Sequence, residues 1–303
     1  MKHFVSVTDL SAEDVLRLFR VAAELKARRK AGDQATPLAG RSLALIFEKP
    51  SLRTRVTFEV GAVQLGGRAV YLTASEIGLG TREAVSDVAR NLSLWVDGIV
   101  ARVNRHETVL TLARHAEVPV FNALSDHEHP CQALADYFTL WERGLELDRI
   151  HVAWIGDGNN VCHSFLLMGA LLGSRLTAAC PPGYEPSPEV LATVRRLGGR
   201  VEVTSDPRAA AAGADVLYTD VWTSMGQEAE QARRREVFRA YQISDVLVRC
   251  ARPSAVVMHC LPAHRGEEIT DAVLDGPQSI VLDQAENRLH AQKAVIREFV
   301  GDR

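Results

Sequence analysis

The chain has 303 residues, of which 47% are hydrophobic and 24% are charged, and its formal net charge is −3. This length suggests two domains, and this composition is typical of a soluble globular protein. A mildly acidic chain without a polybasic segment is a poor candidate for a nonspecific nucleic-acid binder or a membrane-surface protein.

Neither a membrane span nor a secretory signal is expected. The longest purely apolar stretch, 165–173, is far shorter than the roughly 18–20 residues that a membrane helix needs. Asp9, Glu13 and Asp14 precede any apolar segment, which is unlike a secretory signal. The five cysteines are scattered and form no C-x-x-C pair, which favours free thiols in a reducing compartment. We therefore expect a cytoplasmic protein.

Short apolar strands alternate with amphipathic helices along the chain. The first helix is expected to begin after Ser11, with Asp14 three residues on as its capping partner. The first half predicts strands at 42–47, 69–72, 98–103 and 119–123, and helices at 54–65, 85–96, 107–115 and 130–143.

The alternation restarts after a polar segment at 142–148, the best candidate for a linker. The second half predicts strands at 150–155, 175–179, 200–204, 214–218, 255–259 and 279–282, and helices at 161–172, 187–197 and about 289–300. This pattern predicts an α/β fold of two similar-sized domains, each a mainly parallel sheet flanked by helices. Ligands are then expected in the cleft between the domains, at the carboxyl ends of strands.

The segment Ser51-Leu52-Arg53-Thr54-Arg55 follows a predicted buried strand and opens a helix. A helix N-terminus carries unpaired N–H groups and partial positive charge, and Arg53 adds a planar fork that suits phosphate oxygens. The segment therefore predicts an anion site. A capped helix with surface arginines fits the same pattern, and no Walker motif is present.

The segment His127–Gln132 places His129 and Gln132 on one face of a predicted helix start. Both side chains can donate hydrogen bonds to a carbonyl oxygen or an amide. A plain capping role fits as well. A metal site formed by His127, His129 and Cys131 remains an alternative, although the spacing matches no standard zinc pattern.

Two further segments follow predicted strands. Asp220, at the start of 220–228, is a good partner for an ammonium group, whereas Trp222 and Met225 in the same segment fit either packing or a binding loop. Cys260, within 259–266, is a candidate reactive thiol, and a buried inert cysteine is the alternative. A zinc site from His259, Cys260 and His264 is a weaker interpretation.

A fifth segment, 154–160, lies between a predicted strand and a helix and suggests dinucleotide binding. The G-x-G-x-x-G pattern fails, because Val161 stands at the third glycine position. Asn159 and Asn160 suit a carboxylate or amine ligand better. A dinucleotide-dependent dehydrogenase is nevertheless the alternative function that the alternation of strands and helices allows.

The chain resembles the aspartate/ornithine carbamoyltransferases over essentially its whole length. The motifs SLRTR, HPCQ, DVWTSMG and HCLP occur in the order and spacing of that family, at 51–55, 129–132, 220–226 and 259–262. The last two, with GDGNN at 156–160, indicate the ornithine branch.

This resemblance implies a carbamoyl-phosphate domain at 1–145 and an ornithine domain at 146–284, with a C-terminal helix, about 285–303, that packs back on the first domain. It implies transfer of the carbamoyl group from carbamoyl phosphate to the δ-amine of L-ornithine, giving L-citrulline and phosphate in arginine metabolism. No cofactor and no metal are expected. The family resemblance also implies a homotrimer, or a multiple of trimers, with active sites at subunit borders.

The resemblance also assigns roles to individual residues. Those implied to bind carbamoyl phosphate are Ser51, Leu52, Arg53, Thr54, Arg102, His129, Gln132, Cys260, Leu261 and Arg288. Those implied to bind ornithine are Asn160, Asp220, Ser224 and Met225. Those implied to act in catalysis are Arg53, Arg102, His129, Gln132, Asp220, Cys260 and Arg288, with Cys260 as an orienting group rather than a nucleophile.

Two positions depart from the family pattern. Leu52 stands where threonine is common, and we expect that position to act through its backbone N–H. Gly78 stands where the family often carries a glutamine or histidine that reaches the neighbouring subunit. Arg82, in the same loop at 75–83, is the candidate substitute.

Overall fold

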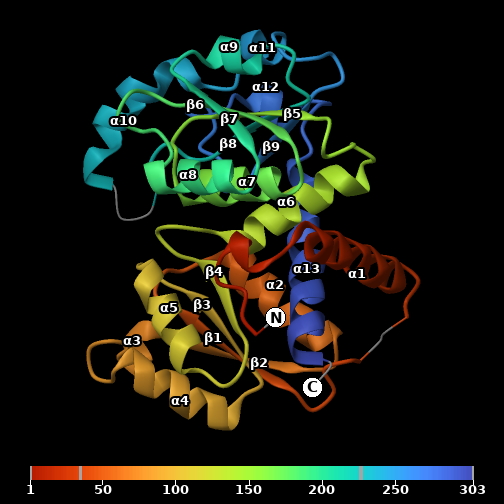
Figure 1. Ribbon diagram of the computed structural model, residues 1–303, viewed down its shortest axis with the longest axis vertical. Coiled ribbons are helices and arrows are strands. Elements are labelled where there is room, and N and C mark those ends of the chain that lie inside the picture. Colours follow the sequence, from red (N-terminus) through yellow and green to blue (C-terminus); the bar gives the residue numbers. More distant parts are fainter. Residues whose placement is uncertain (1, 34–35, 225–227, 302–303) are drawn as a thin grey trace. The chain divides into compact units, whose positions relative to one another are not determined.

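Two parallel sheets organise the chain, one in each of the two units into which it divides (Figure 1). The computed structural model describes residues 2–33, 36–224 and 228–301. Unit 1 consists of Met1–Phe138 and Glu286–Arg303, and unit 2 consists of Thr139–Ala285. The predicted fold class, α/β with mainly parallel sheets flanked by helices, is confirmed.

The sheet of unit 1 has four parallel strands in the order β2-β1-β3-β4. The inner strands are β1 (Ser42–Phe47) and β3 (Gly98–Arg102), and the outer ones are β2 (Arg68–Thr73) and β4 (Val120–Leu124). The helices of this unit are α1 (Ala12–Lys30), α2 (Leu52–Gln64), α3 (Ala74–Ile77), α4 (Val85–Trp95), α5 (His106–His115) and the first part of α6 (Pro130–Glu142). The C-terminal part of α13 (Val281–Ile296) and the π-helix Arg297–Gly301 complete it.

Burial explains why β1 is an inner strand. Its sequence is apolar after Ser42, and all five following residues are buried. An unbroken apolar run is typical of a parallel strand covered on both faces. Ile46 of this strand packs in one core with Ile99 of β3 and Val120 of β4. The predicted start of the first helix is also confirmed, because Ser11 and Asp14 form a reciprocal capping box.

The sheet of unit 2 has five parallel strands in the order β7-β6-β5-β8-β9. These strands are β5 (His151–Ile155), β6 (Arg175–Ala179), β7 (Arg200–Thr204), β8 (Val216–Thr219) and β9 (Val256–His259). The helices are α7 (Asn160–Leu171), α8 (Pro188–Arg196), α9 (Pro207–Ala211), α10 (Gln231–Phe238), α11 (Asp245–Val248) and α12 (Asp271–Leu274), with the end of α6 and the start of α13.

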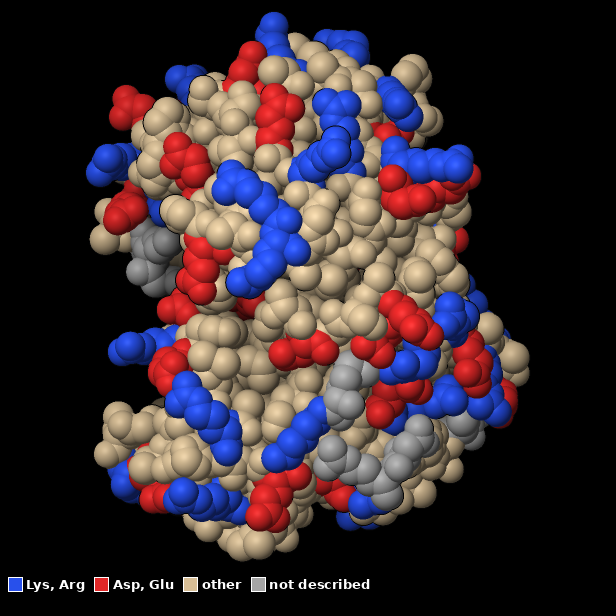
Figure 2. All heavy atoms as spheres, viewed as in Figure 1, with Lys and Arg blue, Asp and Glu red and all other residues tan. Residues whose placement is uncertain are grey.

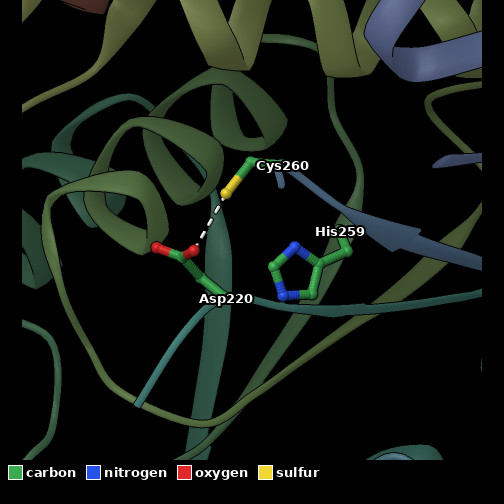
Figure 3. Close-up of side chains that lie close together, drawn as sticks. All are labelled: Asp220, His259 and Cys260. Atoms are coloured by element: carbon green, nitrogen blue, oxygen red, sulfur yellow. Dashed lines mark hydrogen bonds between the residues drawn. The ribbon is translucent and has the colours of Figure 1, made fainter. Parts of the chain in front are cut away.

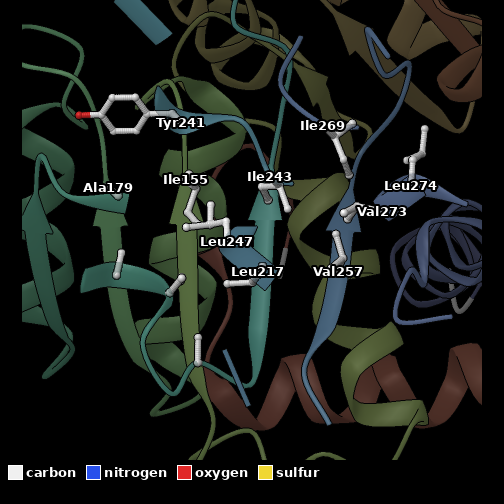
Figure 4. Close-up of a cluster of buried hydrophobic side chains, with 14 of the residues drawn as sticks. Ile155, Ala179, Leu217, Tyr241, Ile243, Leu247, Val257, Ile269, Val273 and Leu274 are labelled. Atoms are coloured by element: carbon white, nitrogen blue, oxygen red, sulfur yellow. The ribbon is translucent and has the colours of Figure 1, made fainter. Parts of the chain in front are cut away.

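One face of this second sheet is covered by a continuous apolar core (Figure 4). Ile155, Leu217 and Val257 project from β5, β8 and β9, and Leu247 of α11 and Val273 of α12 pack against them. The strand order reverses between β5 and β8, where parallel α/β sheets commonly bind ligands at the carboxyl ends of their strands.

Several of the residues that the sequence singles out lie at strand ends, as expected. Arg102 is the last residue of β3, and Ser51 follows β1 at the start of α2. In unit 2, Asp220 directly follows β8 and Cys260 directly follows β9. Each unit therefore gathers its polar candidates at one edge of its own sheet.

One predicted strand is wrong. Residues 279–282 contribute only an isolated bridge between Ser279 and Val257, because α13 already begins at Val281. The final helix therefore begins about eight residues earlier than predicted. The error has a simple cause: a short apolar run such as Ile280–Leu282 looks the same in a buried strand and at the start of a helix.

Acidic and basic side chains are interspersed on the face shown in Figure 2. This distribution contrasts with the clustered basic surface that a nonspecific nucleic-acid binder presents. Among the described residues, no helix combines the length and the apolar character of a membrane span.

Candidate active site

The start of α2 forms the first part of the site in unit 1. Ser51 caps this helix, and its Oγ accepts a hydrogen bond from the N–H of Thr54 at 3.3 Å. The helix begins at Leu52 rather than at the predicted 54, so Leu52, Arg53 and Thr54 form its first turn. Their backbone N–H groups and the helix dipole favour an anion. The Leu52 side chain is 74% exposed, which fits a role through the backbone alone.

Arg288 joins three distant stretches of the sequence within unit 1. Its Nη2 donates to Thr54 Oγ1 at 3.2 Å, and its Nη1 donates to Gln132 Oε1. All three side chains are buried. The structure thus brings together the phosphate motif on α2, the HPCQ motif on α6 and the C-terminal helix α13.

His129 lies directly before α6 and is buried. Burial, together with the positive charges of Arg288 and Arg102, holds the pKa of this imidazole well below its usual range. A neutral imidazole keeps one N–H for donation. His129 can therefore donate a hydrogen bond to a carbonyl oxygen without carrying a charge.

The orientation of Gln132 is fixed by a residue that the sequence analysis did not single out. Gln132 Nε2 donates to Asp136 Oδ1 at 2.7 Å, and the Asp136 side chain is completely buried. Because Arg288 occupies the amide oxygen, Asp136 and Arg288 together set which way the amide points. An acidic residue four positions after Gln132, on the same face of a largely apolar helix, is the signal that could have identified it.

The metal interpretation of His127, His129 and Cys131 gains no support. Among the described residues, the groups whose ligand atoms converge lie elsewhere, at Asp220, His259 and Cys260 and at 264–268. Burial raises the pKa of the Cys131 thiol to about 12, so this side chain stays protonated and apolar in character.

The site in unit 2 centres on the carboxylate of Asp220. Cys260 Sγ donates to Asp220 Oδ1 at 2.9 Å, and Figure 3 shows the thiol directed at this carboxylate. Asn159 Nδ2 donates to the other oxygen, Oδ2, at 2.8 Å. Asp220 is 7% exposed, and both of these donors are neutral. A buried carboxylate with neutral partners is well suited to receive the ammonium group of a ligand.

Asp220, His259 and Cys260 offer ligand atoms within 4.8 Å of one another, but His259 is poorly placed to bind a metal. Its Nε2 lies 3.0 Å from Glu268 Oε1, and its Nδ1 accepts from the backbone N–H of Leu261 at 2.8 Å. Both ring nitrogens are thus already hydrogen-bonded within the protein. The arrangement favours Asp220 and Cys260 as a pair over a three-ligand zinc site.

The second glycine of the GDGNN segment, Gly158, has a packing role. Gly158 donates its N–H to the carbonyl of Tyr184 at 2.8 Å. A Cβ at Gly158 would lie only 2.3 Å from the backbone nitrogen of Pro186. Asn159 caps α7 by accepting from Val161 and Cys162. Close approach of another backbone segment therefore explains this glycine, and the dinucleotide interpretation is not needed.

Arg234 is a second residue that the sequence analysis missed. Its buried guanidinium donates to Asp157 at 2.9 Å and to the carbonyl of Trp222 at 2.7 Å, which ties the GDGNN segment to the loop after β8. Burial raises the pKa of Asp157 to about 6 despite this partner. Arg234 lies within a run of three arginines, so no motif distinguishes it in the sequence.

The structure places two of the three remaining residues that are implied to bind ornithine. Asn160 is the first residue of α7, and Ser224 lies in the loop that follows β8; both are partly buried. Met225 lies outside the described residues.

Gly78 ends α3 in the left-handed conformation, and a Cβ there would meet the Cβ of Arg82 at 2.6 Å. The local backbone thus requires glycine at this departure from the family pattern.

Comparison with known proteins identifies the family of the chain. Residues 2–142 match the family model "Aspartate/ornithine carbamoyltransferase, carbamoyl-P binding domain", and residues 148–298 match its "Asp/Orn binding domain". The chain belongs to the aspartate/ornithine carbamoyltransferase family and is a carbamoyltransferase.

Individual relatives are similar over nearly their whole length. An ornithine carbamoyltransferase of Methanosarcina acetivorans is 51% identical over 296 residues, which are 98% of each chain. An anabolic ornithine carbamoyltransferase of Pyrococcus furiosus is 49% identical, with 99% of this chain and 96% of that one covered. A solved structure of an ornithine carbamoyltransferase from Pyrococcus furiosus superposes with a TM-score of 0.96 at 48% identity, covering 100% of this chain and 98% of that one.

Proposed function

We propose that the chain transfers the carbamoyl group of carbamoyl phosphate to the δ-amine of L-ornithine, giving L-citrulline and phosphate in arginine metabolism. The observation that carries this proposal is the buried carboxylate of Asp220, held by the thiol of Cys260 and the amide of Asn159. This carboxylate can bind the amine of a substrate beside the Cys260 thiol. The similarity to ornithine carbamoyltransferases over nearly the full chain supports the same reaction.

Carbamoyl phosphate binds in unit 1 in this proposal. The helix start at Ser51, Leu52, Arg53 and Thr54 holds the phosphate, with Arg102 as a second cation. The phosphate oxygens then face backbone N–H groups, a hydroxyl and guanidinium forks. The buried bond between Arg288 and Thr54 supports this assignment, because it keeps a guanidinium at the helix end.

The carbamoyl group is bound by His129, Gln132 and Arg288, together with Cys260 and Leu261. The amine nitrogen attacks the carbamoyl carbon, and negative charge develops on the carbonyl oxygen of the tetrahedral intermediate. Donors aimed at that oxygen are worth about 10²–10³ in rate each. The intermediate then collapses: the bond between carbon and phosphate oxygen breaks, the attacking nitrogen gives up its extra proton, and the phosphate leaves with that proton. The neutral state of His129 supports a role as donor rather than as proton acceptor.

Ornithine binds in unit 2, through Asn160, Asp220, Ser224 and Met225. Asp220 and Cys260 orient the δ-amine, which must lose a proton before it attacks. No covalent intermediate on the thiol is required, and neither a metal nor a cofactor enters the reaction. Incubation of the purified protein with both substrates and a colorimetric assay for citrulline tests the proposal.

The assembly in this proposal is a homotrimer or a multiple of trimers in the cytoplasm. An exposed apolar stripe along α2 supports self-association, because such surfaces are usually covered in the functional protein. Four residues at helical spacing form this stripe: Leu52, Val56, Val60 and Val63. Light scattering in solution tests the subunit number. The five free cysteines support a reducing compartment.

A further inference from the structure

The N-terminal segment, residues 4–9, begins along the outer edge of the sheet in unit 1. The N–H of Phe4 donates to the carbonyl of Val120 at 2.8 Å, and the N–H of Asn122 donates to the carbonyl of Phe4 at 2.8 Å. A parallel bridge pairs Phe4 with Phe121 of β4. Phe4 and Val7 are completely buried. The N-terminal segment is therefore packed against β4, the last strand of this sheet.

The carboxylate of Glu128 joins the N-terminal segment to the loop that carries His129. Its Oε1 accepts from Ser6 Oγ at 2.6 Å, and its Oε2 accepts from the backbone N–H of Val7 at 3.0 Å. The shorter of these distances is typical of a hydroxyl that donates to an ionised carboxylate. Glu128 is 2% exposed. Both oxygens of a buried carboxylate are thus bound by two consecutive residues of the N-terminal segment.

The backbone of Glu128 is held as well. Its N–H donates to Ser125 Oγ at 3.2 Å, and its carbonyl accepts from the N–H of Ser125 at 2.9 Å. The Nδ2 of Asn122 donates to the same Ser125 hydroxyl at 3.4 Å and to the carbonyl of Val5 at 2.9 Å. Asn122 is completely buried. His129 therefore follows a residue whose backbone and side chain are both fixed.

We propose that Glu128 is a positioning residue that docks the N-terminal segment onto the loop before α6 and thereby sets the direction of the His129 imidazole. Its effect on carbamoyl transfer rests on the proposed function, in which His129 donates to the carbonyl oxygen. A donor displaced by about 1 Å can slow such a reaction by about 100-fold. The docking of the N-terminal segment does not rest on that function, because the bonds to Ser6 and Val7 exist without substrate.

The test compares Glu128→Ala and Glu128→Gln with the matched control Glu107→Ala. Glu107 is an exposed glutamate of α5 in the same unit, and its carboxylate pairs with Arg114 at 2.8 Å. The first readout is hydrogen–deuterium exchange of the backbone amides of residues 4–9 without substrates. The second is kcat and the KM for each substrate. Far-UV circular dichroism checks that each variant is folded.

Glu128→Ala should raise the exchange rate of the Val7 amide by at least about 10-fold, because this N–H loses its acceptor. The same variant should lower kcat by about 10–100-fold and change the KM for ornithine much less. Glu128→Gln should return both readouts towards the wild type. Its amide oxygen can accept from Val7, and its NH₂ can donate to the Ser6 hydroxyl, which also accepts. Glu107→Ala should behave as the wild type.

An unchanged exchange rate in Glu128→Ala would overturn the proposal. Faster exchange with a wild-type kcat would also overturn it, because a purely structural contact would then loosen without affecting His129. If Glu128→Ala does not fold, Ser6→Ala replaces it, since this variant removes the bond to Oε1. Wild-type exchange and kcat in Ser6→Ala likewise contradict the proposal. If the wild type forms no citrulline, the proposed function fails, whereas the exchange rates still decide whether Glu128 docks the N-terminal segment.

Discussion

The guanidinium of Arg288 donates a hydrogen bond to the hydroxyl of Thr54, which lies 3.2 Å away in space and 234 positions away in the sequence. The same guanidinium donates to the amide oxygen of Gln132. In the proposed function, Thr54 belongs to the phosphate site and Gln132 to the carbamoyl site. One buried cation therefore links the two ends of the same substrate, which gives a physical reason for the C-terminal part of α13 to belong to unit 1.

The phosphate site is tested by Arg53→Lys. Lysine keeps the positive charge but loses the planar fork that binds two phosphate oxygens at once. We expect kcat/KM for carbamoyl phosphate to fall by about 100-fold while the far-UV circular dichroism spectrum stays that of the wild type. Arg55→Lys is the matched control, because Arg55 is exposed and pairs with Glu59 on the same helix. Wild-type kinetics in Arg53→Lys would rule out this assignment.

The role of the thiol is tested by Cys260→Ser. A serine hydroxyl can also donate to Asp220, so an orienting role predicts measurable activity with a KM change that is larger for ornithine than for carbamoyl phosphate. Steady-state kinetics with each substrate varied in turn measures both constants. Mass spectrometric detection of a carbamoylated Cys260 during turnover would show instead that the thiol is a nucleophile.

The pH dependence of stability follows from His290 on α13. Burial and the positive charges of Lys293 and Lys26 lower the pKa of this imidazole from 6.5 to about 4. Between these two pH values the unfolded chain binds a proton at this residue that the folded chain does not. The contribution of the neutral imidazole to stability is therefore fully present above pH 6.5 and is lost as the pH falls towards 4. We expect this residue to contribute a loss on the order of 1–3 kcal/mol.

The variant His290→Gln removes this titration while keeping a polar side chain. Its free energy of unfolding should therefore fall less steeply between pH 6.5 and pH 4 than that of the wild type. Urea unfolding at several pH values measures the difference. Equal slopes in the two proteins would show that His290 does not carry the effect.

Self-association through the stripe on α2 is tested by Val63→Glu. Val63 is 67% exposed, and a carboxylate there would have to be buried without a partner if this surface meets another copy. We expect light scattering to report a mass near one subunit for Val63→Glu and near three, or a multiple of three, for the wild type. Val246→Glu, at an exposed valine of unit 2, should keep the wild-type mass. An unchanged mass for Val63→Glu would exclude the stripe as the interface.

Local sequence patterns were sufficient to predict most of the fold. The apolar run of β1 and the capping box of α1 depend on neighbouring residues only, and both are confirmed. The start of α13 could not be predicted in the same way, because a short apolar run does not distinguish a strand from a helix. Tertiary burial decides that choice.

The same distinction between local sequence patterns and tertiary contacts applies to the candidate site. Residues within recognisable motifs, such as Asp220 and Cys260, were identified from the sequence and lie in contact. Asp136, Arg234 and Glu268 were not, because each acts on another protein residue rather than on a ligand. Their importance depends on which side chains the fold places beside them, and residue spacing does not reveal this.

The most direct test of the central claim is a comparison of kcat/KM for ornithine, lysine, putrescine and N-acetylornithine with carbamoyl phosphate as the donor. A site built around the buried carboxylate of Asp220 predicts citrulline formation from ornithine and a value about 10–200-fold lower for lysine. Putrescine lacks the carboxylate and N-acetylornithine lacks the α-ammonium group, so both should fall by as much as about 10⁴–10⁵. No citrulline from ornithine, or equal values for ornithine and either of the last two amines, would contradict the claim.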